Sequence, residues 1–240
     1  MKLHGSLLFC LAAAVLFPSI ASSHTLDKLI LTQHWPITFC TVERCNQSIS
    51  YWTLHGLWPD NGAFCNSSWH FNSSEIEDLL PEMKQYWPNL FNPGSTTFWK
   101  NEWRKHGTCA AKSATLNTQH KYFAKTLQLY HKLDLNGVLR KFGITPSENY
   151  YTLQQVEGVL ENFYRVKPKI QCVHPSKNGD FQTLAQLEIC LNLDYKLENC
   201  THSHQFQRRV KASDFSVCDQ DLPIYYPPTV RKKMNSTTVE

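Results

Sequence analysis

Residues 50–60, SYWTLHGLWPD, combine a strand pattern with a histidine. Bulky side chains alternate along residues 50–57, which is the pattern of a half-buried strand. His55 lies inside this stretch, and Trp58 and Asp60 follow it directly. The segment therefore predicts a strand that carries one candidate functional histidine.

A second segment, FWKNEWRKHGTC at residues 98–109, places another histidine among charged residues. On a helix, Glu102 and His106 are four residues apart and share a face, and Lys105 lies close to both. The spacing alone favours a solvated ion-pair face. Three aromatic side chains within the same segment argue against that interpretation, because a solvated face does not need them.

Residue periodicity predicts further strands and helices on either side of these two segments. Strands are expected at residues 26–32, 169–173 and 183–193. Helices are expected at residues 74–83, 97–106, 120–133 and 152–164, where Ser74 with Glu77 and Thr152 with Gln155 form capping boxes. Gly107 would end the helix at residues 97–106, and Phe163 would be buried on the helix at residues 152–164. Because strands and helices do not alternate regularly, the sequence predicts an α+β fold.

The composition describes one globular domain. Of the 240 residues, 42% are hydrophobic and 18% are charged, so the chain has enough apolar material to fold. Neither a repeat nor a flexible linker divides residues 24–228, and residues 229–240 form a polar tail. The net charge of +4 permits an anionic substrate but does not indicate tight, charge-driven nucleic-acid binding, which usually requires a dense basic stripe.

The first residues indicate the secretory pathway. Lys2 precedes an apolar run at residues 7–17, so residues 1–23 are expected to be a signal peptide. Cys10 would leave with it, and the eight remaining cysteines would form four disulfides in an oxidising compartment. Five glycosylation sequons support a lumenal or secreted glycoprotein: Asn46, Asn66, Asn72, Asn199 and Asn235. No further segment has the length of a membrane span, so a soluble protein is expected.

Several kinds of site find no support in the sequence. Neither a zinc-protease, EF-hand or P-loop motif nor a serine-hydrolase elbow is present. His202 and His204 follow Cys200 and are better explained as solvent-exposed residues than as zinc ligands, which would require two further partners. We therefore expect no metal and no cofactor.

Two histidines interleaved with aromatic residues suit the cleavage of RNA. RNA carries its own nucleophile, the 2′-hydroxyl beside each phosphodiester. An enzyme then needs one base and one acid, and imidazoles can supply both because their pKa lies near 6.5. A nearby cation would stabilise the developing charge on the phosphate, and exposed rings would hold unstacked bases.

The two segments resemble the active-site motifs of the ribonuclease T2 family, which comprises acid endoribonucleases of secretory and lysosomal compartments. The matching motifs are HGLWPD at residues 55–60 and the run from Trp99 to Cys109, and the similarity extends from about residue 31 to residue 228. The resemblance implies a central antiparallel sheet flanked by several helices. It also implies cleavage of single-stranded RNA to a 2′,3′-cyclic phosphate, which is then hydrolysed more slowly.

Carried over to this chain, the resemblance assigns a role to each motif residue. His55 and His106 would be the acid–base pair, with His106 preferred as base and His55 as acid, although the sequence does not decide between them. Lys105 and Glu102 would bind or polarise the phosphate; the glutamate would act by orienting its neighbours or by being protonated at acid pH. Two base pockets would contain the following residues: Trp58 and Asp60 in the first, Phe98 and His34 in the second.

One position departs from the family pattern. Many members have histidine directly before the motif glutamate, where this chain has Asn101, so weaker phosphate binding is expected.

The resemblance implies four disulfide pairs: Cys40–Cys45, Cys65–Cys109, Cys172–Cys218 and Cys190–Cys200. The second pair would connect the two histidine segments covalently.

Two other functions remain open at this point. A ribonuclease-like binding protein would act without cleavage, as a signalling or cytotoxic factor. A secreted metal-dependent nuclease would also cut DNA and would fail in EDTA. The expected enzyme is a monomer that acts on single-stranded RNA, not on DNA or membranes, in the lysosome or outside the cell.

Overall fold

Five strands lie side by side in the order β2 (Thr53–Pro59), β1 (Lys28–His34), β5 (Gln182–Asn192), β4 (Lys169–Val173) and β7 (Phe215–Val217), and each neighbouring pair is antiparallel. The structure is a computed structural model that describes residues 26–45, 47–175, 179–200 and 215–229. The expected signal peptide, Asn46, Asn235, His202 and His204 therefore lie outside the described residues.

Three short strands extend the sheet and make it mixed. β6 (Leu197–Glu198) pairs with β5, and β3 (Tyr150–Tyr151) pairs with β8 (Ile224–Tyr225). β8 also pairs with β5 in parallel, while the five central strands form the antiparallel sheet that was expected. The α+β class is confirmed.

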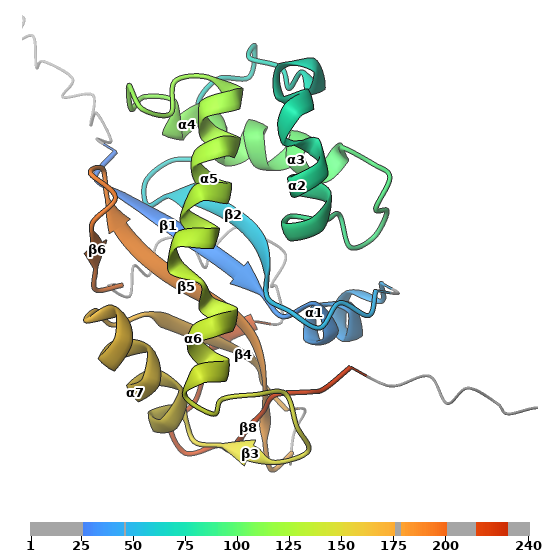
Figure 1. The fold of residues 1–240 in the computed structure, drawn as a ribbon, viewed down its shortest axis with the longest axis vertical. Coiled ribbons are helices and arrows are strands. Elements are labelled where there is room, and N and C mark those ends of the chain that lie inside the picture. The colour runs from blue at the N-terminus through green and yellow to red at the C-terminus, as the bar shows by residue number, and fades with distance from the viewer. Residues whose placement is uncertain (1–25, 46, 176–178, 201–214, 230–240) are drawn as a thin grey trace, which may run out of the picture.

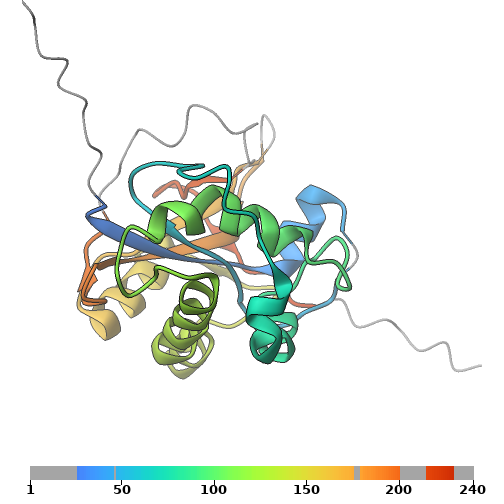
Figure 2. The same cartoon turned by 90° about the horizontal axis from the view of Figure 1, so that it is seen from above.

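The helices surround this sheet. They are α1 (Pro36–Glu43), the 3-10 helix η1 (Ser73–Leu79), α2 (Leu80–Tyr86), α3 (Thr97–Glu102), the π-helical turn η2 (Trp103–Gly107), α4 (Thr108–Ala110), α5 (Gln119–Leu133), α6 (Leu135–Lys141) and α7 (Leu153–Tyr164). Figure 1 shows α5 lying across the sheet, with α6 and α7 beyond its end. In Figure 2, the α5 ribbon lies below the sheet and the green ribbon of α3 and η2 lies above it.

The long helices follow the expected apolar faces, with one error. Tyr130, Phe123 and Leu127 of α5 are buried, and α5 packs against η1, β1 and β2. The capping box that begins α7 is present, with Thr152 and Gln155 as its two members. Phe163 is 45% exposed, so its expected burial was wrong. The buried face of α7 ends at Tyr164 instead, because a helix returns to the same face after three or four residues.

Two helix boundaries differ from the sequence expectation. Asn72 caps η1 by accepting a hydrogen bond of 3.1 Å from the Ser74 backbone, so the expected Ser74–Glu77 capping box does not begin the helix. Gly107 does not end a helix, because its φ of −58° is helical and the chain continues into α4. A Cβ at residue 107 would overlap with the ring of Trp103, so this glycine permits close packing.

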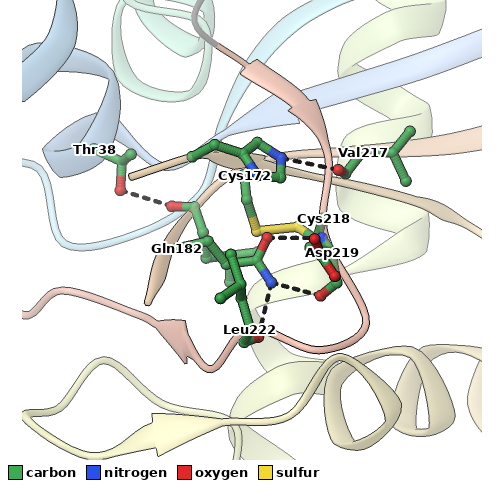
Figure 3. Close-up of a disulfide and its surroundings, with 9 residues drawn as sticks. Thr38, Cys172, Gln182, Val217, Cys218, Asp219 and Leu222 are labelled. Atoms are coloured by element: carbon green, nitrogen blue, oxygen red, sulfur yellow. Dashed lines mark hydrogen bonds between the residues drawn. A yellow bond between two sulfur atoms is a disulfide. The ribbon is translucent and has the colours of Figure 1, made fainter. Parts of the chain in front are cut away.

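A disulfide and a buried amide hold the segment between β7 and β8 against strands β4 and β5. Cys172 of β4 is bonded to Cys218, which follows β7. The side chain of Gln182, which is fully buried, donates to the carbonyls of Asp219 and Leu222 and accepts from the Asp219 backbone (Figure 3). Since β8 begins two residues after Leu222, these contacts position the parallel strand on β5.

Among the described residues, there is no helix with the length and apolar character needed to cross a membrane.

Candidate active site

His55 occupies a β-bulge in strand β2. Thr32 of β1 pairs with Gly56 and Gln33 pairs with Leu54, so His55 is the extra residue between two paired positions. A bulge leaves one residue unpaired and redirects its side chain. The imidazole is half-buried, and its Nδ1 lies 2.8 Å from Oε1 of Gln186 on β5.

Glu102 and His106 come from the other side of the site, at the end of α3 and within η2. Both side chains are buried, with 6% and 2% of their surface exposed. The π-helical turn carries one more residue per turn than an α-helix, a form that often occurs at functional sites. Glu102 and His106 therefore face the protein, which excludes the solvated ion-pair face that the spacing alone suggested.

Trp58 links the two segments. Its Nε1 donates a hydrogen bond of 2.8 Å to Oε2 of Glu102. Its ring stacks on His106, with centroids 5.1 Å apart and an interplanar angle of 22°, and meets His55 edge-on at 4.8 Å. One indole thus contacts both candidate catalytic histidines and the candidate carboxyl group.

Burial sets the ionisation of these groups. It raises the pKa of Glu102 to about 7, although the Trp58 hydrogen bond and the charge of Lys105 oppose the rise. Burial lowers the pKa of His55 to about 4, while Gln186 opposes that shift and Lys105 adds to it. Burial, Lys105 and His55 together hold the pKa of His106 well below its ordinary value. These mutual effects show that the four groups form one electrostatic cluster.

His106, like His34, has no hydrogen-bond partner for its ring among the described residues. Both of its ring nitrogens are buried and lack a hydrogen bond within the part of the chain that the structure describes. A buried imidazole normally finds a partner, because an unsatisfied polar group destabilises the fold by about 1–3 kcal/mol. The ring is therefore available to a bound ligand.

The candidate base-binding residues lie around this centre. His34 is buried on β1, stacks on Phe39 at 4.8 Å and lies 5.2 Å from His55 between ring centroids. Phe98 is partly buried at 5.9 Å from His55. One carboxylate oxygen of Asp60 accepts from the Lys28 backbone at 3.1 Å and fixes the end of β2.

Lys105 and Asn101 differ in how closely they join the cluster. Lys105 is half-buried, and its charge lowers the pKa of both His55 and His106. Asn101 is exposed on α3 and has no hydrogen bond to the cluster among the described residues.

Three residues at the site escaped the sequence interpretation. Phe39 lies between His34 and Phe91, which is 60% exposed and 5.8 Å from Phe39. Neither phenylalanine stands in a motif, so only the fold could reveal their position. Gln186 had a usable signal, because it is a polar residue inside the apolar run LAQLEICL of β5.

The structure contains the four disulfides that the resemblance implies: Cys40–Cys45, Cys65–Cys109, Cys172–Cys218 and Cys190–Cys200. The Cys65–Cys109 bond joins the loop after β2 to α4. In the same loop, the Phe64 backbone donates a hydrogen bond of 2.9 Å to the carbonyl of Lys105. The two histidine segments are thus connected by one covalent bond and one backbone hydrogen bond.

Fold and site together correspond to an α+β endoribonuclease with a pair of imidazoles as candidate acid and base. The model of the Ribonuclease T2 family matches residues 26–228. The chain therefore belongs to the ribonuclease T2 family and is an endoribonuclease, which confirms the resemblance of the two motifs.

Individual relatives agree with this assignment. Ribonuclease T2 of Danio rerio is 56% identical over 209 residues, which cover 84% of this chain and 87% of the relative. The crystal structure of human RNase T2 superposes with a TM-score of 0.73 at 47% identity, over 84% of this chain and 98% of the human one. A mutant of RNase MC1 solved in complex with 5′-GMP gives a TM-score of 0.66 at 25% identity, over 74% and 95% of the two chains.

Proposed function

We propose that this protein cleaves single-stranded RNA by attack of the 2′-hydroxyl on the adjacent phosphorus. The new bond joins the 2′-oxygen to phosphorus, the bond to the 5′-oxygen breaks, and a 2′,3′-cyclic phosphate remains. Water then opens the cyclic phosphate in a slower second step. The observation that supports this most directly is the placement of two imidazoles against one indole, Trp58.

The two imidazoles take different roles in this proposal. His106 removes the proton from the 2′-hydroxyl, because its low pKa keeps the ring neutral and its nitrogens have no partner within the described residues. His55 donates a proton to the departing 5′-oxygen. Burial lowers the pKa of His55 to about 4, and the Gln186 hydrogen bond, which favours the protonated ring, opposes that shift. Each such transfer contributes about 10²–10⁴ to the rate.

Lys105 and Glu102 act on the phosphate itself. The ammonium group of Lys105 stabilises the negative charge that develops on the non-bridging oxygens. Glu102, with a pKa of about 7, carries a proton at acid pH and can donate a hydrogen bond to a phosphate oxygen. This removes the objection that a carboxylate would repel the substrate, and it favours an acidic optimum.

The rings around this centre hold the bases. Trp58 and Asp60 form the first pocket, and Phe98 and His34 form the second, to which we now add Phe39 and Phe91. Asp60 uses for this role the carboxylate oxygen that does not bind Lys28. Base–aromatic stacking of this kind is worth about 1–3 kcal/mol per base.

The protein acts as a monomer in the secretory pathway, in the lysosome or outside the cell, after removal of residues 1–23. Residues 24–228 would then be one ribonuclease domain with a tail at residues 229–240. Asn66, Asn72 and Asn199 are exposed, as glycosylation requires. A mobility shift on treatment with a glycosidase tests their occupancy in the secreted protein.

The test is incubation with RNA and with DNA near pH 5 in EDTA, for the parent, His55→Ala and His106→Ala. Cleavage of RNA alone to cyclic phosphate ends, lost in both variants, supports the proposal. A parent that requires a divalent metal and also cuts DNA indicates a metal-dependent nuclease. A folded parent without activity on RNA indicates a protein that acts by binding.

A further inference from the structure

The buried amide of Gln186 lies at the centre of the sheet, beneath the candidate active site. It pairs with His34 of β1 on one side and with Gln171 of β4 on the other, and it is 5% exposed. Its Oε1 lies 2.8 Å from Nδ1 of His55. Its Nε2 donates to Oε1 of Gln171 and to Oε1 of Glu188, the latter at 3.4 Å.

The orientation of this amide is fixed by an ion pair. Glu188 is buried on β5, and its carboxylate lies 3.2 Å from the ammonium group of Lys169 on β4. Burial raises the pKa of Glu188, and the charge and hydrogen bond of Lys169 oppose that rise. The ionised carboxylate can only accept hydrogen bonds, so it must face Nε2 of Gln186. A flipped amide would place two oxygens against each other. The series of contacts from Lys169 through Glu188 to Gln186 therefore turns the amide oxygen of Gln186 toward His55.

An amide oxygen also only accepts, so Nδ1 of His55 must carry a proton. The two nitrogens of a neutral imidazole share one proton, and the hydrogen bond of one nitrogen determines the state of the other. Nε2 of His55 is then left with a free lone pair, and it has no hydrogen bond to any part of the chain that the structure describes.

We propose that Gln186 is a positioning residue that restricts every proton transfer of His55 to Nε2, and that the Lys169–Glu188 ion pair holds its amide in the required orientation. This inference rests on the proposed function, because it assumes that His55 is a catalytic acid or base. It applies to either role, since the proton leaves or arrives at the same nitrogen. Gln186 is a positioning residue because it contacts His55 at Nδ1, the nitrogen that does not transfer the proton.

The alternative is that Gln186 only fills space within the sheet. Gln33 offers a matched control for that alternative. It lies on the adjacent strand β1, is also buried, and pairs with Leu187, so its side chain belongs to the opposite face of the sheet from Gln186. Its amide atoms have no partner within the described residues. Gln33→Leu thus makes the same chemical change without altering the contact with His55.

The experiment compares the parent, Gln186→Leu, Gln186→Glu and Gln33→Leu. Nitrogen-15 NMR of the imidazoles reports which nitrogen of His55 is protonated above its pKa, and the pH dependence of kcat and KM is measured on a dinucleotide. The other titratable groups around His55, namely His34, Lys105 and His106, remain in place in all four proteins.

In Gln186→Leu, we expect the protonated nitrogen of neutral His55 to change from Nδ1 to a mixture. We also expect kcat to fall by about 10- to 100-fold, within the range of a general acid–base contribution, with little change in KM. The limb of the profile that reports the pKa of His55, which is the alkaline limb for an acid and the acidic limb for a base, should move to lower pH, because a hydrogen bond that favours the protonated ring is lost. Gln186→Glu keeps an acceptor, so Nδ1 stays protonated and the limb moves to higher pH.

Three results would overturn this inference: a parent-like NMR state and pH profile in Gln186→Leu, an equal change in Gln33→Leu, or a His55 limb that does not move in opposite directions in the two Gln186 variants. The failure of the proposed function is a separate outcome. If His55→Ala retains the activity of the parent, His55 is not catalytic, whatever the Gln186 variants do. If His55→Ala is inactive and Gln186→Leu resembles the parent, only the role of Gln186 is excluded.

Discussion

The indole of Trp58 donates a hydrogen bond of 2.8 Å to the buried carboxyl group of Glu102, and this contact joins strand β2 to the end of helix α3. The same ring stacks on His106 and meets His55 edge-on. Trp58 thus contacts both imidazoles and the carboxyl group. Base stacking by Trp58 remains a proposal, and the structure adds a second role in which the ring holds the site together.

Substitution of Trp58 should separate these two roles. Trp58→Phe keeps a flat ring but loses the N–H group that binds Glu102, so a buried acceptor loses its partner. We expect kcat to fall by about 10-fold, in line with the roughly 1–3 kcal/mol that an unsatisfied buried group involves. Trp58→Ala should lose far more. Steady-state kinetics on a dinucleotide checks this, and equal activity in Trp58→Phe and the parent would exclude a role for the hydrogen bond.

Gly56 is needed for the close approach of Trp58 and Glu102. A Cβ at residue 56 would overlap with Oε2 of Glu102 and Nε1 of Trp58. We expect Gly56→Ala to fold and to lose activity by about 10- to 100-fold, because a small displacement of a catalytic group can reduce the rate that much.

Gly158 provides the control for this substitution. It lies in α7, and a Cβ there would meet no atom within 4 Å. Gly158→Ala should keep the parent activity and raise the free energy of unfolding by up to about 1 kcal/mol, because alanine favours a helix more than glycine does. Activity assays with urea unfolding of both variants decide the matter. Equal activities in the two would show that residue 56 tolerates a side chain.

The disulfide Cys65–Cys109 should support activity as well as stability. It spans 44 residues, and Cys172–Cys218 spans 46, so the loop-closure entropy predicts a similar loss of about 4 kcal/mol for each double Cys→Ala variant. Only Cys65–Cys109 connects the two histidine segments. In conditions where both variants are folded, kcat/KM should therefore fall for C65A/C109A alone. A similar fall for C172A/C218A would mean that the bond acts through global stability.

Much of this architecture follows from local pattern in the sequence. Helix α7 was predicted with its capping box, because Thr152 and Gln155 make contacts within one turn. The boundaries of the elements around the site are harder to predict from sequence, since Gly107 looks like a helix terminus until the packing of Trp103 is known. The bulge at His55 depends on the register of two strands, which no local pattern encodes. For the same reason, the contact between His55 and Gln186, 131 residues apart, could not be predicted.

Because many family members have histidine where this chain has Asn101, we expect the substitution Asn101→His to strengthen the binding of RNA at acid pH. Asn101 is exposed on α3, directly before Glu102. An exposed histidine there would be protonated near pH 5, so Asn101→His should lower KM at that pH and have little effect above pH 7.5. Because the acid–base pair is unchanged, kcat should stay close to that of the parent. The measurement is KM for RNA at both pH values, and cleavage no better than that of the parent at pH 5 would contradict the account.

The raised pKa of Glu102 predicts how the free energy of unfolding depends on pH. Its pKa is about 7 in the folded protein and has an ordinary value of 4.5. Between these values, the folded state keeps a proton that the unfolded state has lost, so the contribution of this group is present below pH 4.5 and is lost as the pH rises through 7. Glu102→Gln is always neutral, and its amide oxygen can still accept from Trp58.

The difference in unfolding free energy, Glu102→Gln minus parent, should therefore increase from pH 5 to pH 7 and then level off. His34, His55 and His106 titrate with the opposite sign, because burial lowers their pKa and favours the neutral rings as the pH rises. Since both proteins contain these histidines, their contributions cancel in the difference. Urea unfolding at pH 5, 6, 7 and 8 measures it. A difference that stays constant over this range would show that Glu102 is already ionised at pH 5, and that its proton has no part in holding the phosphate.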